Sequence, residues 1–434
     1  MTAGASVRHP CDAKARRVTA SGPGGSTPFA SDRMHHHNVR NLAIAVALSA
    51  ATAGAQGFTP QNVEVHGFGS WNAGATNNSN LYLGSQNRGS SRNADAGFTI
   101  TGRMDEKLSF VTQVQFDFSG QTQTSLDYVF AQYDFNDALK LRAGQVKQPF
   151  GLYTETIDIG VIRPFLSAPQ AVYGPTANIA EAFRGIGLTG NFKLPGTMSM
   201  DYDVYGGGLN REEYEPTLDA YRVMQGRRTF AQVSDGFGTE ITDQVYGGRL
   251  MMNLPFQGMR IGASGYHGNT AEFPIPGRGD VQTVIYSFEY VANRVGFRSE
   301  ALREWEGDHD RQNGWYYEGS YRLGGGWQLA GLFDRATTHT KGKKPGCAAP
   351  CSDLPSVGAS MLYHKEVAGG LNYYFSPTFA MKASYHHIDG NRFAQPSRDD
   401  LVSTLQAAYT ANPTGPNALK PTTNAFLLGA QFAF

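Results

Sequence analysis

The chain has 434 residues, of which 52 are glycine and 47 are tyrosine or phenylalanine, and only 17% carry a formal charge. This composition favours strands and turns over helices. No apolar run approaches the roughly 18 to 20 residues of a membrane-spanning helix, which argues against a helical membrane protein.

Residues 34–55, MHHHNVRNLAIAVALSAATAGA, have the pattern of a secretory signal peptide. Arg40 precedes an apolar core at Leu42–Ala53, and Ala53-Gly54-Ala55 is a small-residue cleavage motif. The histidines His35–His37 fall at the start of this signal, which favours that role over a metal cluster. The sequence therefore predicts export and cleavage before residue 56.

Residues 1–33 precede the signal and are rich in Pro, Gly, Ser and Arg. We expect them to be a disordered, wrongly assigned leader, with translation starting at Met34; an ordered N-terminal arm is the alternative. Residues 1–55 hold six of the 37 basic and two of the 37 acidic residues, which leaves 31 against 35 and a formal charge of −4. This charge does not suggest nucleic-acid binding.

Beyond the signal peptide the chain keeps two cysteines, Cys347 and Cys351, in KGKKPGCAAPCSD. An even pair in an exported protein predicts a disulfide that closes a small loop. A metal site would need histidines or further cysteines nearby, and this segment has none.

From Val63 onward, stretches with strand character alternate with connections of two lengths. In Leu108–Phe118, for example, Leu108, Phe110 and Val114 share one face, while Ser109, Gln113 and Gln115 share the other. The expected strands are 63–71, 95–103, 108–118, 126–135, 139–147, 183–193, 198–205, 244–253, 259–267, 281–291, 294–305, 315–323, 327–335, 363–375, 378–387 and 424–434. The glycine runs at 206–208 and 324–326 are expected to be turns at strand ends.

Seven short turns and eight longer connections join these strands in strict alternation. Short periplasmic turns and longer outer loops are typical of outer-membrane barrels, and a negative mean hydropathy fits strands in which only alternate residues face lipid. The predicted fold is all-β: residues 56–434 form a sixteen-stranded antiparallel transmembrane β-barrel in the outer membrane of a Gram-negative bacterium.

One connection stands apart from the others. More than thirty residues with three prolines (Pro149, Pro164 and Pro169) and no sustained period separate the strands at 139–147 and 183–193. Loops of this length in a compact domain are usually functional. We expect this third outer loop to fold into the lumen and to narrow a pore.

The last strand alternates Phe426, Leu428, Ala430, Phe432 and Phe434. It resembles the C-terminal strand of Gram-negative outer-membrane proteins, whose terminal phenylalanine is recognised by the barrel-assembly machinery. An ordinary edge strand that ends in Phe by chance is the alternative.

The stretch LRAGQVKQPFGLYTETIDIGVIRPFLSAPQAVYG resembles the phosphate-selective porins, which carry a basic, glycine and Lys-x-Pro-Phe-Gly pattern before the inward loop. Arg142–Gly151 and Arg163–Tyr173 match that style, and the strand layout is similar over roughly residues 60–434. The resemblance implies a homotrimer of pores. It does not imply selectivity for phosphate, because the chain has no uninterrupted row of lysines and arginines along its strands.

A pore discriminates by its width and by the charges at its narrowest point. The inward loop and its flanks offer both signs, which would set up a transverse field there. The candidate constriction residues are Lys147, Arg163 and Arg184 as cations and Glu155, Asp158 and Glu181 as anions. Any of these could instead form a salt bridge or hold the loop to the wall.

The alternation of inward and outward positions along the strands also predicts a lumen wall that carries charges of both signs. The candidates are Lys140, Arg142, Arg249, Arg294 and Arg298 among the cations and Asp117, Asp201, Asp203, Glu300 and Glu304 among the anions. A shift of one residue would place each charge against lipid, at a cost of about 2–4 kcal/mol for Arg or Lys. This mixture predicts weak ion selectivity.

The sequence contains no Gly-x-Ser-x-Gly or HExxH motif, so we expect neither an enzyme nor a cofactor. Adjacent His386 and His387 would point to opposite faces of a strand, which predicts no metal site there. The expected function is passive diffusion of small hydrophilic solutes and ions through a porin, in contact with membrane lipid and lipopolysaccharide. A solute-specific anion channel is the main alternative, and a lipase-type barrel enzyme or a plugged adhesin is less favoured.

Overall fold

The computed structural model describes residues 62–78, 89–118, 122–174, 180–214, 216, 219, 223, 228–234, 237–270, 280–306, 310–340, 360, 363–393, 398–399, 401–403, 406 and 420–434. The chain divides into units at residues 1–56 and 57–434, and every described residue lies in the second. The expected leader, the signal peptide and the Cys347–Cys351 pair lie outside the described residues.

All sixteen expected strands are present. They are β1 (Val63–Thr76), β2 (Ser90–Arg103), β3 (Leu108–Asp117), β4 (Gln123–Asn136), β5 (Leu139–Lys147), β6 (Ala182–Lys193), β7 (Ser199–Tyr214), β8 (Phe237–Asn253), β9 (Met259–Thr270), β10 (Asp280–Ala292), β11 (Val295–Glu306), β12 (Asp310–Gly324), β13 (Trp327–Thr340), β14 (Tyr363–Ser376), β15 (Phe379–Asp389) and β16 (Thr422–Ala433).

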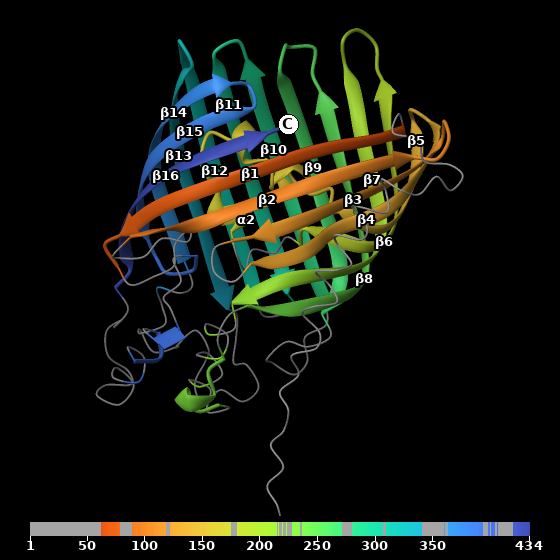
Figure 1. The fold of residues 1–434 in the computed structure, drawn as a ribbon. Helices are drawn as coiled ribbons and strands as arrows, with labels where there is room; N and C mark the ends of the chain where they lie inside the picture. Colours follow the sequence, from red (N-terminus) through yellow and green to blue (C-terminus); the bar gives the residue numbers. More distant parts are fainter. Residues whose placement is uncertain are drawn as a thin grey trace, which may run out of the picture. The chain divides into compact units, whose positions relative to one another are not determined.

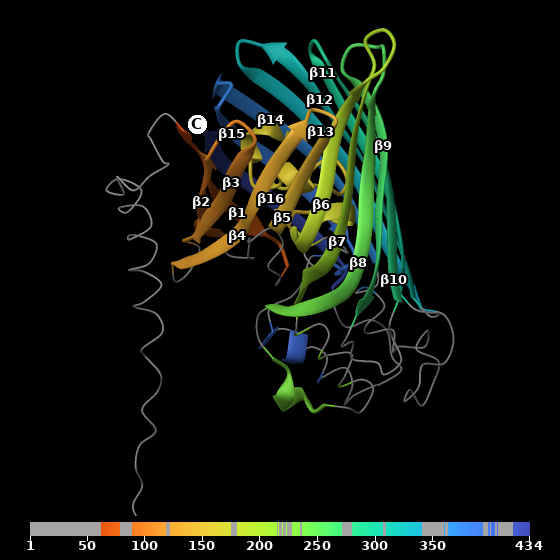
Figure 2. The same ribbon diagram turned by 90° about the vertical axis from the view of Figure 1, so that its right-hand side faces the viewer.

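The strands form one closed antiparallel barrel in sequence order, and β1 pairs with β16 to close it. Phe434 completes the closure: its backbone N–H donates to the carbonyl of Gly67, and the N–H of Gly67 donates to the carbonyl of Phe434. Figures 1 and 2 show the C-terminus at the end of the barrel where the short turns lie. The predicted sixteen-stranded antiparallel barrel is confirmed.

Alternate residues of each strand differ in environment, as the sequence predicts. On β3, Phe110 is 45% exposed on the outer face, whereas Gln113 on the inner face is 4% exposed. The described residues include no helix with the length and apolar character needed to cross a membrane.

The turn expected at Gly324–Gly326 joins β12 to β13, and all three glycines have positive φ, which side chains with a Cβ rarely adopt. The prediction of a turn at residues 206–208 is wrong, because these glycines lie inside β7. A Cβ on Gly207 would lie 2.0 Å from the carbonyl oxygen of Arg184 on β6. The glycines therefore serve close strand approach rather than a turn.

Several strands are longer than predicted, and the extra residues are at the end that lies away from the short turns. β7 continues to Tyr214 and β8 begins at Phe237, so the charged connection between them is shorter than the expected 206–243. The connection from β11 to β12 shrinks to residues 307–309, so not all eight outer connections are long. Between β5 and β6 lie three short helices: η3 (Thr154–Thr156), η4 (Gly160–Ile162) and α2 (Gln170–Tyr173).

Candidate functional site

The segment between β5 and β6, residues 148–181, contacts strands far from its own. Helix α2 contacts β11, β12 and β13, and η4 contacts β1 and β16. Phe150, Phe165 and Val172 of the segment are almost fully buried in one cluster with inward side chains of the strands, including Ile285 and Leu332. Burial of each such side chain contributes about 1.5–3 kcal/mol, so apolar packing holds the segment against these strands.

Carboxylates of the strands accept hydrogen bonds from this segment. Glu300 on β11 accepts from the backbone N–H of Leu152 at 2.9 Å and from the hydroxyl of Tyr173. Asp334 on β13 accepts from the N–H of Ala171 at 3.0 Å. An irregular segment has few hydrogen bonds of its own, and buried backbone groups need partners. These carboxylates supply them.

The ammonium group of Lys382 on β15 has the complementary role. It donates to the carbonyl of Gly160 at 2.8 Å, to the carbonyl of Arg163, and to Oε1 of Gln431 at 2.7 Å. The sequence analysis did not select Lys382, although its inward parity on β15 was available as a signal.

Lys147 lies at the start of the segment and joins it to the strands. Its Nζ is 2.9 Å from a carboxylate oxygen of Asp127 on β4, 2.9 Å from one of Asp158, and 3.7 Å from one of Glu181. Burial acts to raise the pKa of Asp158, but the Lys147 ammonium, its hydrogen bond and that of Gln113 outweigh burial and lower it. Lys147 and Asp158 therefore anchor the segment and do not face open water.

Arg163 also serves the segment itself. Its guanidinium donates to the backbone carbonyls of Ile157 and Leu166, and the residue is 5% exposed. The expected pore cation at this position is thus a buried support of the segment's backbone.

Glu155 is a predicted constriction residue that meets two strand cations at a partly exposed position. One carboxylate oxygen lies 2.5 Å from Arg249 on β8, and the other lies 3.9 Å from Arg142 on β5. Arg249 also pairs with Asp203 at 2.9 Å. The side chains of Glu155 and Arg142 are 33% and 25% exposed, so this group of opposite charges is open to solvent.

A second row of charges continues along the inner face from β9 to β12. Glu289 on β10 lies 3.4 Å from Arg260 and 2.7 Å from Arg298, and Arg298 lies 3.6 Å from Glu318. The hydroxyl of Tyr153 in the segment donates to Glu318. Arg298 was expected on the lumen wall; Arg260, Glu289 and Glu318 were missed.

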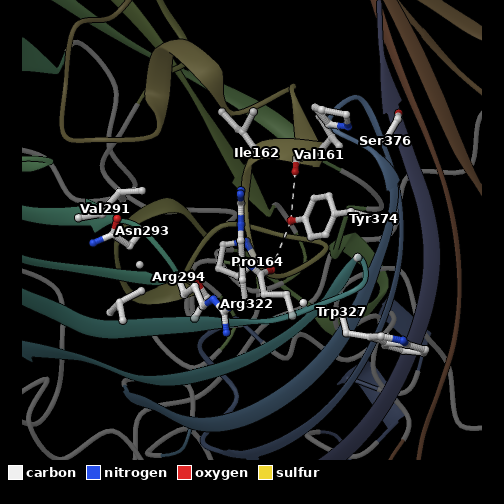
Figure 3. Close-up of a pocket in the computed structure, with 18 of the residues that line it drawn as sticks. Val161, Ile162, Pro164, Val291, Asn293, Arg294, Arg322, Trp327, Tyr374 and Ser376 are labelled. Atoms are coloured by element: carbon white, nitrogen blue, oxygen red, sulfur yellow. Dashed lines mark hydrogen bonds between the residues drawn. The ribbon is translucent and has the colours of Figure 1, made fainter.

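A pocket of about 650 Å³ lies between this segment and the short turns. Figure 3 shows Val161 and Ile162 in the upper part of the view and Arg294 and Arg322 below them, with Pro164 next to Arg322. Arg298 also lines the pocket, and the described residues of its lining include no carboxylate. Its electrostatic character is therefore basic.

The remaining predicted residues divide into several groups. Lys140 is inward on β5, 3.9 Å from Asp134, and Asp117 is on the inner face of β3, opposite Asp95. Glu300 is inward but 1% exposed, so it anchors the segment rather than lining water. Arg294 is not on a strand, because β10 ends at Ala292 and β11 begins at Val295; it lies in the turn.

The structure places Arg184 away from the lumen. It shares the outer face of β6 with Ile186 and Leu188, which are 59% and 40% exposed. Its guanidinium hydrogen-bonds Gln145 at 3.0 Å. The prediction that Arg184 belongs to the constriction is wrong, and parity with Ile186 and Leu188 already carried the contrary signal.

A serine, a histidine and a glutamate form a hydrogen-bonded chain on the inner face of β14 and β15. Ser384 Oγ is 2.8 Å from Nε2 of His386, whose Nδ1 contacts Glu366. Ser384 is 5% exposed and the ring of Phe165 lies against His386. A lipase-type site needs such a pair on the outer face of the barrel, and this pair is on the other face.

Residues 76–156 match the family model of the phosphate-selective porins O and P. No curated protein matches the chain. Among solved structures, the outer membrane channel DcaP of Acinetobacter baumannii is similar with a TM-score of 0.51 at 10% identity, over 88% of this chain and 100% of that chain. An anion-selective porin from Comamonas acidovorans has a TM-score of 0.51 at 11% identity, over 86% and 99%.

At these identities the solved structures support the fold alone. The family match covers β2, β3, β4 and β5, with Arg142 on β5, and the first part of the segment, with Glu155. Together the match and the barrel indicate an outer-membrane channel rather than an enzyme. The chain is therefore similar to the phosphate-selective porins of the outer membrane, as its sequence predicted.

Proposed function

We propose that this protein is an outer-membrane porin that passes small hydrophilic solutes and ions by passive diffusion, with the segment between β5 and β6 lying in the lumen and narrowing it. The observation that carries the proposal is the contact of this segment with β11 to β16 and β1, strands on several sides of a closed barrel. A segment that begins at β5 reaches all of them most directly through the lumen.

The open passage follows the side of the segment where charges stay partly exposed. The segment's bonds to buried wall carboxylates and to Lys382 lie on β11, β12, β13 and β15, and it also hydrogen-bonds Tyr205 on β7 and Ser264 on β9. Partly exposed charges lie instead on β5 and on β8 to β11, at Arg142, Arg249, Arg260 and Arg298. The proposed path of the solutes runs along the partly exposed group that Glu155 forms with Arg142 and Arg249.

The charges along this path are balanced within pairs. Arg142, Arg249, Arg260 and Arg298 each have a carboxylate neighbour among Glu155, Asp203, Glu289 and Glu318. Paired charges leave a small net field, so a general pore fits better than strict selectivity, and the basic pocket beyond these pairs would add a slight anion preference.

A solute-specific anion channel is the second candidate, and the basic pocket is the observation that favours it. Arg294, Arg298 and Arg322 surround about 650 Å³ with no carboxylate among the described lining residues (Figure 3). Guanidinium groups bind phosphates and carboxylates by paired hydrogen bonds. An anion that leaves the constriction would enter this pocket before it reaches the short-turn end.

Planar-bilayer recordings under a KCl gradient test both candidates. A large, steady conductance with a small reversal potential of anionic sign supports the general porin, and a small conductance blocked by millimolar phosphate supports the specific channel. The double change Arg294→Gln and Arg322→Gln should reduce the anion preference, while Arg184→Gln, which removes a charge from the outer face, should leave it unchanged. Correctly folded barrels without conductance would contradict both candidates and favour a plugged adhesin.

The proposal includes an assembly pathway and partners. We expect a signal peptide at residues 34–55 to be cleaved, the barrel-assembly machinery to recognise Phe434, and a homotrimer to form. Arg335 and Lys365 are cross-strand neighbours on the outer face of β13 and β14 and offer a contact for lipopolysaccharide phosphates. N-terminal sequencing, crosslinking of the purified protein and thiol labelling of Cys347 and Cys351 with and without reductant test these points.

A further inference from the structure

Inward side chains from three neighbouring strands meet beneath α2, away from the exposed charges of the passage. Asp334 is on β13, His364 and Glu366 are on β14, and His386 is on β15. Asp334 and Glu366 are direct cross-strand partners, and His364 is two residues from Glu366 on the same face. All four residues are at most 1% exposed.

The ligand atoms of three of these residues lie close enough to share one ion. Nε2 of His364 is 2.9 Å from Oδ1 of Asp334 and 3.2 Å from Oε2 of Glu366, and the three atoms lie within 4.8 Å of one another. A tetrahedral zinc ion with bonds of about 2.0–2.2 Å separates its ligand atoms by roughly 3.3–3.6 Å. We propose that Asp334, His364 and Glu366 bind a divalent transition-metal ion of the zinc class.

A second observation points to a missing ligand at the same place. Oδ1 of Asp334 is buried, and Nε2 of His364, 2.9 Å away, makes no well-aligned hydrogen bond to it. A buried carboxylate oxygen without a well-aligned donor is costly. A metal ion between Asp334 and His364 satisfies this oxygen and leaves the other one free to hold the N–H of Ala171.

The barrel contains another carboxylate group with ligand spacing, and the contrast is informative. Asp127, Asp158 and Glu181 also lie within 4.8 Å of one another, but the ammonium of Lys147 lies among them. An ammonium cannot ligate a metal, so that group is already neutralised. Asp334 and Glu366 instead share an imidazole nitrogen, which is itself a metal ligand.

His386 supports the site without touching the ion. Its Nδ1 contacts the second oxygen of Glu366, and its Nε2 lies 2.8 Å from Ser384 Oγ. Histidine and carboxylate partners of this kind orient metal ligands and raise affinity. Because His386 holds Glu366 in place, we assign it as a positioning residue.

A small cavity adjoins the site. It has a volume of about 10 Å³ and is lined by Ala171, Ala336 and Phe393 among others, and the ring of Phe393 lies against His364.

The ligand chemistry selects the ion. Two carboxylates and one imidazole suit zinc, cobalt and related transition metals, whereas magnesium and calcium prefer oxygen ligands alone. The two negative charges of Asp334 and Glu366 balance a divalent ion when His364 binds it as a neutral imidazole. The ion would tie β13, β14 and α2 together.

Titration of the chelator-treated, refolded full chain with Co²⁺ tests the proposal. His35–His37 are changed to Gln in every sample, because they could bind metal themselves. We expect one Co²⁺ per chain with visible absorption of a low-coordinate site, displaced by Zn²⁺ and not by Mg²⁺. The change His364→Gln should weaken binding at least 100-fold and His386→Gln about 10- to 100-fold.

His387→Gln is the matched control, since His387 neighbours His386 in sequence but contacts Asn424 on the outer face; it should bind as the unchanged protein does. The absence of any Co²⁺ or Zn²⁺ binding at micromolar concentration, or equal binding by His364→Gln, would overturn the proposal. If His364→Gln does not fold, X-ray absorption of the Zn²⁺-loaded unchanged protein decides: one imidazole in the shell supports the site and an all-oxygen shell overturns it.

Discussion

A single methyl group at Gly314 should displace the segment between β5 and β6, which we propose narrows the lumen. Gly314 is on the inner face of β12, directly against α2, and a Cβ there would lie 2.1 Å from the carbonyl oxygen of Ala171. Real side chains do not approach backbone oxygen so closely, so in Gly314→Ala helix α2 must move away by roughly 1 Å or more.

The cost of this movement follows from what holds α2. Overpacking of a filled interior costs about 1–3 kcal/mol. Movement of Ala171 also strains its 3.0 Å hydrogen bond to the buried carboxylate of Asp334, and bonds to charged groups contribute about 1.5–3 kcal/mol. A loss of about 2 kcal/mol already lowers the ratio of docked to undocked segment roughly 30-fold, because 1.4 kcal/mol is a factor of ten.

Single-channel recording and thermal unfolding measure this effect. Gly314→Ala should show more frequent transitions between current levels and a lower unfolding temperature than Gly319→Ala. Gly319 is on the same strand but on its outer face, and a Cβ there meets no atom within 4 Å. Identical conductance, current noise and unfolding temperature in the two variants would refute the argument that α2 packs against β12 and that the segment narrows the pore.

Three further outcomes are expected. Lys147→Met leaves the carboxylates of Asp127 and Asp158 buried without their ammonium and should reduce the unfolding free energy by about 3–5 kcal/mol in urea titrations; unchanged stability would contradict an anchoring role. Glu155→Gln removes the carboxylate between Arg142 and Arg249, so the reversal potential in a KCl gradient should become more anion-selective, and a shift toward cations would count against the proposed passage. Because the pKa of Asp158 is below its usual 3.8, its contribution to anchoring is present above pH 3.8 and is lost as the pH falls through the lower, folded value. The Asp158 contribution to current noise should therefore appear under strongly acidic conditions, and a rise already at pH 6 would show that another group beside Lys147, such as Asp127, controls the segment.

The sequence predicted the barrel well because strand alternation is a local signal repeated sixteen times. Leu139–Lys147 matches β5 at both ends, and most other strands differ only by extension away from the short turns. The failure at residues 206–208 has a definite cause. Glycine runs predict turns locally, but here they allow β6 and β7 to approach each other closely, which depends on the neighbouring strand.

The candidate site was harder to predict, because the segment between β5 and β6 has no regular alternation of apolar and polar residues. Parity places Arg142 and Arg298 on the inner face correctly, but nothing comparable distinguishes Glu155, which meets Arg142 and Arg249, from Asp158, which is buried beside Lys147. That difference depends on which side of the segment packs against the wall. Long-range contacts decide it, and a single sequence does not contain them.

The inward charges of this barrel therefore have two different uses, and only one bears on permeation. On β11, β12, β13 and β15, buried Glu300, Glu318, Asp334 and Lys382 satisfy an irregular segment that has few hydrogen bonds of its own. Backbone away from regular structure at membrane depth requires such partners. A count of inward charges overstates the charge that ions meet, because these groups are already neutralised or covered. Selectivity should follow the exposed arginines near Glu155 and the basic pocket, and changes at the buried groups should alter the stability of the segment instead.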